Sequence, residues 1–250
     1  QHNRDYVSGG IKSVTKQVKS KQRVADHGEV FTAEREVKAM CDLVKAETER
    51  IDSRFLEPAC GDGNFLAEIL FRKLAVVKKK YKKFPMDYEK NSVLAVSSLY
   101  GVDILQDNCE ACRERLYRMW DKEYKAVCKK EVSEDCRRSV RFILSRNIVC
   151  GNALSLMCVD ENQQDTGDPI VFSEWAFVTG YQLQRSDYTF AKLMQGDDEA
   201  RDLFGKKRRK KREEQMTLFD ADEPTEKPSD EGEFLKKYVT HYRRVWENEQ

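Results

Sequence analysis

The sequence has few prolines and no long hydrophobic run. Five of its 250 residues are proline, and no two of them are adjacent. No stretch of about 18 apolar residues occurs, so we expect no transmembrane helix and no membrane partner. The first ten residues, QHNRDYVSGG, lack the apolar core of a signal peptide, which favours a cytoplasmic location. With 40% apolar residues, the chain is neither collagen-like nor wholly disordered.

The chain also lacks an excess of either charge, because 45 Lys and Arg face 44 Asp and Glu. The charges are nevertheless unevenly distributed. Residues 1–25 form a basic arm, residues 206–212 read KKRRKKR, and residues 220–233 are largely acidic. We therefore expect a charged flexible linker over 196–233. The basic run is either a linker that aids solubility or a contact for nucleic-acid phosphates.

The eight cysteines are dispersed, which is typical of reduced thiols in a cytoplasmic protein. Cys109 and Cys112 form a C-x2-C pair, which is half of a zinc or redox motif. No second close pair of Cys or His accompanies it, and its surroundings have a helical pattern. A structural zinc ion needs four ligands, so we expect no metal site.

Residues 26–195 carry the pattern of a folded domain in which strands alternate with helices. This order predicts βαβ units and a parallel sheet, and therefore an α/β fold. The expected helices are 34–47, 64–81 and 106–127, and the expected strands are 54–60, 97–104, 147–150 and 169–177.

No convincing strand is recognised after residue 180, so we expect the sheet to stop near its fourth strand. An exposed edge strand would result, and we expect a partner subunit or a second copy to cover it. The segment 234–250 predicts a C-terminal amphipathic helix with one apolar side. That side consists of Leu235, Val239, Tyr242 and Trp246.

The sharpest motif follows the first expected strand. Residues 57–65 read EPACGDGNF, and the glycines permit close approach of a ligand to the backbone and to a helix N-terminus. Asp103 ends the second strand, where an acidic side chain can accept hydrogen bonds from a ribose diol. The alternatives are an ordinary tight turn for the glycines and a helix N-cap for Asp103.

These residues resemble the S-adenosylmethionine-dependent DNA methyltransferases of the N6-adenine class, including modification subunits of type I restriction–modification systems. FLEPACGDGNFL resembles motif I of that family, and HGEVFTAEREVKAM (27–40) resembles the motif that precedes it. YGVDI resembles motif II, and NIVCGNAL (147–154) resembles motif III. The resemblance implies a Rossmann-like class I methyltransferase sheet over 26–195, with S-adenosylmethionine as cofactor and DNA as substrate.

The resemblance also implies the cofactor-binding residues. The leading motif would hold the methionine end of the cofactor, motif I would surround it, and Asp103 would bind its ribose. Ile104 would lie against the adenine ring, and Asn152 would contact the adenine edge. The full set is Gly28, Phe31, Thr32, Glu57, Pro58, Gly61, Gly63, Asp103, Ile104 and Asn152.

The catalytic motif of the family is Asn, Asp or Ser, then Pro-Pro and an aromatic residue. It binds the target amino group, and its ring stacks on the flipped-out base. This chain has no Pro-Pro. Ser173, Glu174 and Trp175 occupy the corresponding place and are the catalytic candidates. The alternative, which we favour for Trp175 and Phe177, is that the aromatics belong to the core or to an interface.

Three functions remain open at this point. The first is an active adenine-N6 DNA methyltransferase of a restriction–modification system. The second is a catalytically deficient or split-enzyme subunit that binds the cofactor and needs a partner. The third is a non-enzymatic adaptor for DNA or for the replication sliding clamp, because Gln215–Phe219 (QMTLF) resembles the clamp-binding peptide.

Overall fold

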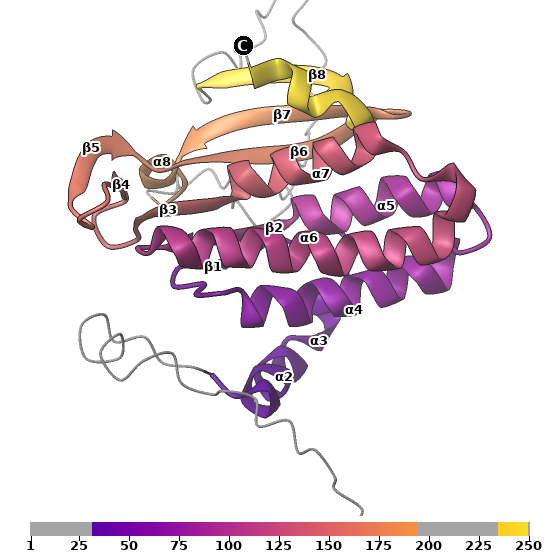
Figure 1. Ribbon diagram of the computed structural model, residues 1–250, viewed down its shortest axis with the longest axis horizontal. Helices are drawn as coiled ribbons and strands as arrows, with labels where there is room; N and C mark the ends of the chain where they lie inside the picture. The colour runs from indigo at the N-terminus through magenta and orange to yellow at the C-terminus, as the bar shows by residue number, and fades with distance from the viewer. Residues whose placement is uncertain (1–31, 195–234, 250) are drawn as a thin grey trace, which may run out of the picture. The chain divides into compact units, whose positions relative to one another are not determined.

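The computed structural model describes residues 32–194 and 235–249 (Figure 1). The chain divides into a unit of residues 1–33 and a unit of residues 34–250, and the second unit carries all the elements below. The helices are α2 (Glu34–Leu43), α3 (Lys45–Thr48), α4 (Asn64–Tyr81), α5 (Pro85–Ser97), α6 (Gln106–Cys128), α7 (Glu134–Asn147), α8 (Phe190–Met194) and the 3-10 helices η1 (Lys129–Glu131) and η3 (Tyr242–Glu249). Among the described residues, no helix is long and apolar enough to span a membrane.

Two sheets organise the described chain. The first has the strand order β1-β2-β3-β4-β5, and the second has the order β6-β7-β8. The first sheet contains β1 (Phe55–Glu57), β2 (Leu99–Asp103), β3 (Ile148–Asn152), β4 (Met157–Val159) and β5 (Asp165–Pro169), and the second contains β6 (Val171–Thr179), β7 (Gln182–Thr189) and β8 (Lys236–His241). Strands β1, β2 and β3 pair in parallel, whereas β4 and β5 pair antiparallel. The α/β class is confirmed, and the five-stranded sheet is mixed rather than parallel throughout.

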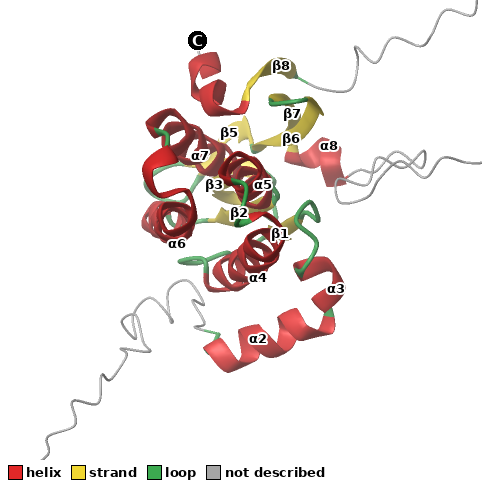
Figure 2. Cartoon of the chain, turned by 90° about the vertical axis from the view of Figure 1, so that its right-hand side faces the viewer, coloured by secondary structure: helices red, strands yellow, loops and turns green. Residues whose placement is uncertain are grey.

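The four long helices α4, α5, α6 and α7 pack next to one another against the first sheet (Figures 1 and 2). Successive residues of a strand point to opposite faces of the sheet. Leu99 of β2 and Ile148 of β3 accordingly belong to the core under these helices. Tyr100 and Val102 belong to a second, smaller core with Ile170, Phe172 and Phe190. Both faces of β2 are therefore buried.

The second sheet corrects two expectations. The segment expected as the fourth parallel strand is β6, which pairs antiparallel with β7. The expectation of no strand after residue 180 is wrong, because β7 and β8 follow. The sequence pattern hid β7, since its middle residues Arg185, Ser186 and Asp187 are polar yet buried. The chain's own strands thus cover one edge of β6, so this edge gives no reason to invoke a partner.

The expected C-terminal amphipathic helix is also wrong. Residues Lys236–His241 form β8, which pairs with β7 in the register Gln184↔Val239. Only from Tyr242 does the chain become helical, and there it is a 3-10 helix. Tyr242 and Val245 are buried, three residues apart as this helix type requires, whereas Leu235 is 58% exposed. The edge of β7 decided this conformation, because β8 pairs with backbone N–H and C=O groups that would otherwise be left unpaired on that edge.

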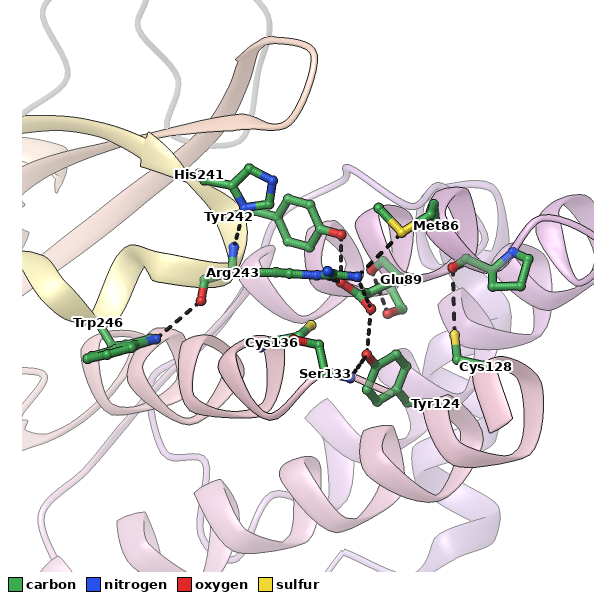
Figure 3. A network of polar contacts seen from close by, with 12 residues as sticks. Met86, Glu89, Tyr124, Cys128, Ser133, Cys136, His241, Tyr242, Arg243 and Trp246 are labelled. Atoms are coloured by element: carbon green, nitrogen blue, oxygen red, sulfur yellow. Dashed lines mark hydrogen bonds and ion pairs between the residues drawn. The ribbon is translucent and has the colours of Figure 1, made fainter. Parts of the chain in front are cut away.

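A buried carboxylate holds the C-terminal segment against the helices (Figure 3). Glu89 of α5 is 1% exposed and accepts hydrogen bonds from the Tyr124 hydroxyl at 2.5 Å and the Tyr242 hydroxyl at 2.6 Å. Arg243 donates to both Glu89 oxygens from Nε at 2.5 Å and from a terminal nitrogen at 3.0 Å. Because this bonding favours the charged guanidinium, it raises the pKa of Arg243. The segment 235–249 therefore belongs to the same folded unit as the sheet, not to a separate tail.

Candidate functional site

The candidate site lies where three parallel strands end. Glu57, Asp103 and Asn152 are the last residues of β1, β2 and β3, and the register pairs Glu57 with Gly101 and Asp103 with Cys150. Parallel strands bring their carboxyl ends to the same edge of the sheet. The structure therefore gathers at one edge the side chains that the sequence placed at three separate motifs.

The loop between β1 and α4 is fixed by its glycines and by β2. The Cys60 amide donates to the Val102 carbonyl at 2.9 Å, which extends the pairing beyond Glu57. Gly61 and Gly63 have φ angles of +51° and +85°, which favour glycine. A Cβ on Gly61 would have no atom within 4 Å, whereas a Cβ on Gly63 would lie 2.6 Å from the Cys112 sulfur. Gly61 therefore faces open space, and Gly63 permits α4 to begin close to α6.

Asp103 joins this loop to the start of α6. Its Oδ2 accepts a hydrogen bond from the Gly61 amide at 2.9 Å. Its Oδ1 accepts from the Leu105 amide at 2.9 Å and from the Asn108 side chain at 3.1 Å. Leu105, not Asp103, is the N-cap residue of α6, so the N-cap alternative for Asp103 is wrong. The ribose-binding role of Asp103 stays a prediction. A carboxylate has about four acceptor positions, so one remains, on Oδ2.

The C-x2-C pair supports this edge by packing. The Cys109 thiol donates to the Asp103 carbonyl at 3.6 Å, and the Cys112 sulfur lies against Gly63. The hydrogen bond with Cys112 and burial both raise the pKa of the Cys60 thiol. Burial also raises the pKa of the Cys109 thiol, so both cysteines favour the neutral thiol. Cysteines here act as small buried side chains that allow close contact.

Ile104 and Asn152 lie on the same edge. Ile104 is half-buried, and its carbonyl accepts a hydrogen bond from the Cys150 thiol at 3.6 Å. The Asn152 Oδ1 accepts from the Leu154 amide at 3.0 Å, so its oxygen shapes the turn after β3. The Asn152 amide nitrogen donates no hydrogen bond to the described residues. It is thus the half of the side chain available to a ligand.

Glu57 and Pro58 complete the described part of the site. Glu57 is half-buried, and burial raises the pKa of its carboxyl group, although a hydrogen bond from the Ala59 amide opposes this shift. Pro58 is exposed. Of the leading motif, Gly28 and Phe31 lie outside the described residues. Thr32 is half-buried and belongs to the unit of residues 1–33.

A comparison with protein families identifies the chain at this point. The family model for the DNA-methyltransferase domain of MmeI matches residues 32–181. The chain belongs to this family. The family is one of restriction–modification DNA methyltransferases, in agreement with the resemblance seen in motifs I to III. No curated protein and no solved structure matches the chain.

The catalytic candidates do not form an open site. Ser173 is fully buried, and its hydroxyl donates to Asp187 at 2.6 Å. Glu174 forms an ion pair with Arg54, which comes just before β1. Trp175 is 4% exposed, and its indole nitrogen donates to Asn147 at 2.9 Å.

The catalytic role of these three residues stays a prediction, and the contacts of Ser173 and Trp175 favour packing instead. A base-stacking ring must present its face to the ligand, and the Trp175 ring instead packs edge-on against Phe142 of α7. The Ser173 oxygen belongs to a buried cluster with Arg185 and Asp187 that joins β6 to β7. The alternative interpretation of Trp175 as a core aromatic is the one that the structure supports.

Sequence reasoning missed two residues of the site. Asn108 binds Asp103 from the first turn of α6, and Cys112 sets the distance between Gly63 and α6. A polar residue five positions after the acidic one was the available signal for Asn108. The C-x2-C spacing marked Cys112 only as a candidate metal ligand, and its contact with Gly63, 49 positions away, left no signal in the sequence.

Proposed function

We propose that the chain binds S-adenosylmethionine at the edge formed by Glu57, Asp103 and Asn152, and that it serves methylation of adenine N6 in DNA. The observation that carries this proposal is the hydrogen bond between the Gly61 amide and Asp103 Oδ2. This bond brings motif I and motif II into one site. S-adenosylmethionine would supply there a methyl group activated by its positively charged sulfur.

The described residues fit this cofactor in three respects. The remaining acceptor position of Asp103 suits one ribose hydroxyl, so we expect one strong hydrogen bond rather than two. The Asn152 amide nitrogen can donate to an acceptor on the adenine ring. Gly61 leaves open space where a side chain would stand, and so lets a ligand approach the backbone.

The proposal assigns the cofactor-binding half of the reaction to this chain, as in the split-enzyme alternative. No Pro-Pro turn occurs in the 250 residues, and the residues at its expected place are buried or paired. In the described part of the chain, β1 pairs only with β2, so its other edge has no strand beside it. We infer that residues outside these 250 supply the catalytic turn, as a partner subunit would.

The first test is cofactor affinity, measured by isothermal titration calorimetry. Asp103→Ala should weaken binding of S-adenosylmethionine by about 1.5–3 kcal/mol, because one charge-assisted hydrogen bond is lost. This corresponds to a dissociation constant that rises roughly 10- to 150-fold. Asp168→Ala is the matched control, since Asp168 is an exposed carboxylate of β5. Equal affinities of wild type and the Asp103 variant would remove Asp103 from the site.

The second test is transfer of labelled methyl from S-adenosylmethionine to unmodified DNA of mixed sequence. The purified chain should bind the cofactor and transfer no label by itself. Label in DNA would refute the split-enzyme proposal and would require a catalytic turn within these residues. Mapping the label to adenine N6 or to another atom would then test the base specificity.

A further inference from the structure

Two connections between helices meet at the end of α4 and α6 that is remote from the cofactor edge. One connection joins α4 to α5, and the other follows α6. Their contact is direct, since the Cys128 thiol donates to the Pro85 carbonyl at 3.6 Å (Figure 3). An ion pair between Lys78 of α4 and Glu123 of α6, at 2.8 Å, joins these two helices near the same end. Figure 2 shows the ends of these helices side by side.

These connections and the helix ends beside them carry a dense cluster of lysines, which we call the basic tip. All of its members are exposed, and none forms an ion pair with a described residue. The basic tip consists of Lys79, Lys80, Lys82, Lys83, Lys129 and Lys130. The exposed acidic residues beside it are Asp87, Glu131, Glu134 and Asp135, and Glu134 is paired with Arg137. Positive charge therefore predominates. Phe84, directly after Lys83, is 60% exposed and gives the tip an apolar surface as well.

One lysine of the tip occupies a strained backbone position. Lys129, which follows α6, has φ 49° and ψ −107°. These angles are close to those of the first central residue of a type II′ turn, where glycine is usual. A residue with a side chain is strained at such a position, so a lysine here carries a backbone cost that glycine would avoid. A lysine near a helix C-terminus also interacts favourably with the helix dipole. A lysine in the last turn of α6 would give the same benefit without the positive φ of Lys129, so the dipole does not explain its place.

We propose that the basic tip binds the phosphate backbone of duplex DNA, as a second contact remote from the cofactor edge. The inference rests on the proposed function, which makes DNA the substrate. Clustered lysines gain binding free energy mainly from a polyanion, because they release the cations condensed on it. The 18 residues of α4 separate the tip from the cofactor loop by ~27 Å. A duplex running along α4 would therefore meet the tip about eight base pairs from the target base, at 3.4 Å per base pair.

The test measures how salt affects binding of a fluorescent 30-base-pair duplex of mixed, unmodified sequence by the full chain. In the tip variant Lys80, Lys82 and Lys83 are replaced by Gln. Three lost phosphate contacts should make the slope of log K against log salt about 2.7 shallower. The affinity at 0.1 M salt should fall up to ~500-fold. The control variant replaces three other exposed lysines, Lys45, Lys236 and Lys237, by Gln and should keep the wild-type slope.

A second pair of variants separates function from folding. Lys129→Gly should raise the Tm, because glycine tolerates these angles, and should also make the salt slope shallower by about 0.9. Gln163→Gly is its control, since Gln163 also has a positive φ, of 61°, and lies on the turn before β5. It should raise the Tm without a change in slope. A charge cluster that serves solubility alone would not give this combination.

The outcomes distinguish the two proposals. An unchanged slope in the tip variant, or an equal change in the control variant, would overturn the role of the basic tip. So would a wild-type chain that binds no duplex. Calorimetry with S-adenosylmethionine on the same samples tests the cofactor site independently. Intact cofactor binding with an unchanged slope would refute the tip and leave the proposed function standing.

Discussion

In the loop between β1 and α4, the close packing of Gly63 against Cys112 gives a quantitative prediction for Gly63→Ala. The new Cβ would lie 2.6 Å from the Cys112 sulfur and 3.4 Å from the Cys112 Cα, at a φ of +85°. The backbone conformation alone costs an L-residue about 1–2 kcal/mol. Overpacking against α6 adds about 1–3 kcal/mol. We therefore expect the free energy of unfolding to decrease by about 2–5 kcal/mol.

Two further variants separate these contributions. Gly61→Ala has the positive φ of +51° but no neighbouring atom within 4 Å, so it should cost only about 1–2 kcal/mol. Cys112→Ala removes the sulfur that meets the new Cβ. In a double-mutant cycle, Gly63→Ala should therefore cost about 1–3 kcal/mol less in the Cys112→Ala background than in the wild type.

Urea-induced unfolding, followed by circular dichroism, measures the stability of the wild type and of the four variants. The reasoning would be refuted if Gly61→Ala and Gly63→Ala cost the same, or if the cycle gave no coupling between Gly63 and Cys112. Either result would mean that α4 does not need to start this close to α6. S-adenosylmethionine affinity of the folded fraction would then show whether the loop keeps its shape.

The remaining predictions concern two buried charged groups away from the site. Glu89→Ala should lower the free energy of unfolding by about 3–5 kcal/mol, because it leaves the Arg243 charge and two tyrosine hydroxyls without their acceptor. Its control, Arg244→Ala, breaks only an exposed ion pair and should leave the free energy of unfolding nearly unchanged in the same urea titration. Burial lowers the pKa of Lys73 to about 7, so between pH 7 and 8.5 the unfolded chain binds more protons and stability should rise with pH. Lys73→Met should remove this component, and an unchanged difference in stability between the two proteins across that range would contradict the assignment.

Much of the candidate cofactor site could be predicted from the sequence, because its motifs are local. Helical periodicity after Asn64 and a short apolar run before Glu57 place the glycine loop between a strand and a helix. Parallel strands then bring Asp103 and Asn152 to the same edge. The prediction was less complete for the helical layer, since α5 and α7 were not recognised.

The sequence by itself determined the α/β class, the order of the first three strands and the family, because each depends on residues close together in the chain. Only the tertiary structure decided the fate of β7, β8 and Trp175. The spacing of the apolar residues around Val239 is compatible with a helix or a strand, and pairing with the free edge of β7 selected the strand. Trp175 could serve as a stacking or a core aromatic, and its contacts with Asn147 and Phe142 of α7 made it core. In both cases the deciding partner lies far away in the sequence, so local pattern could not reveal it.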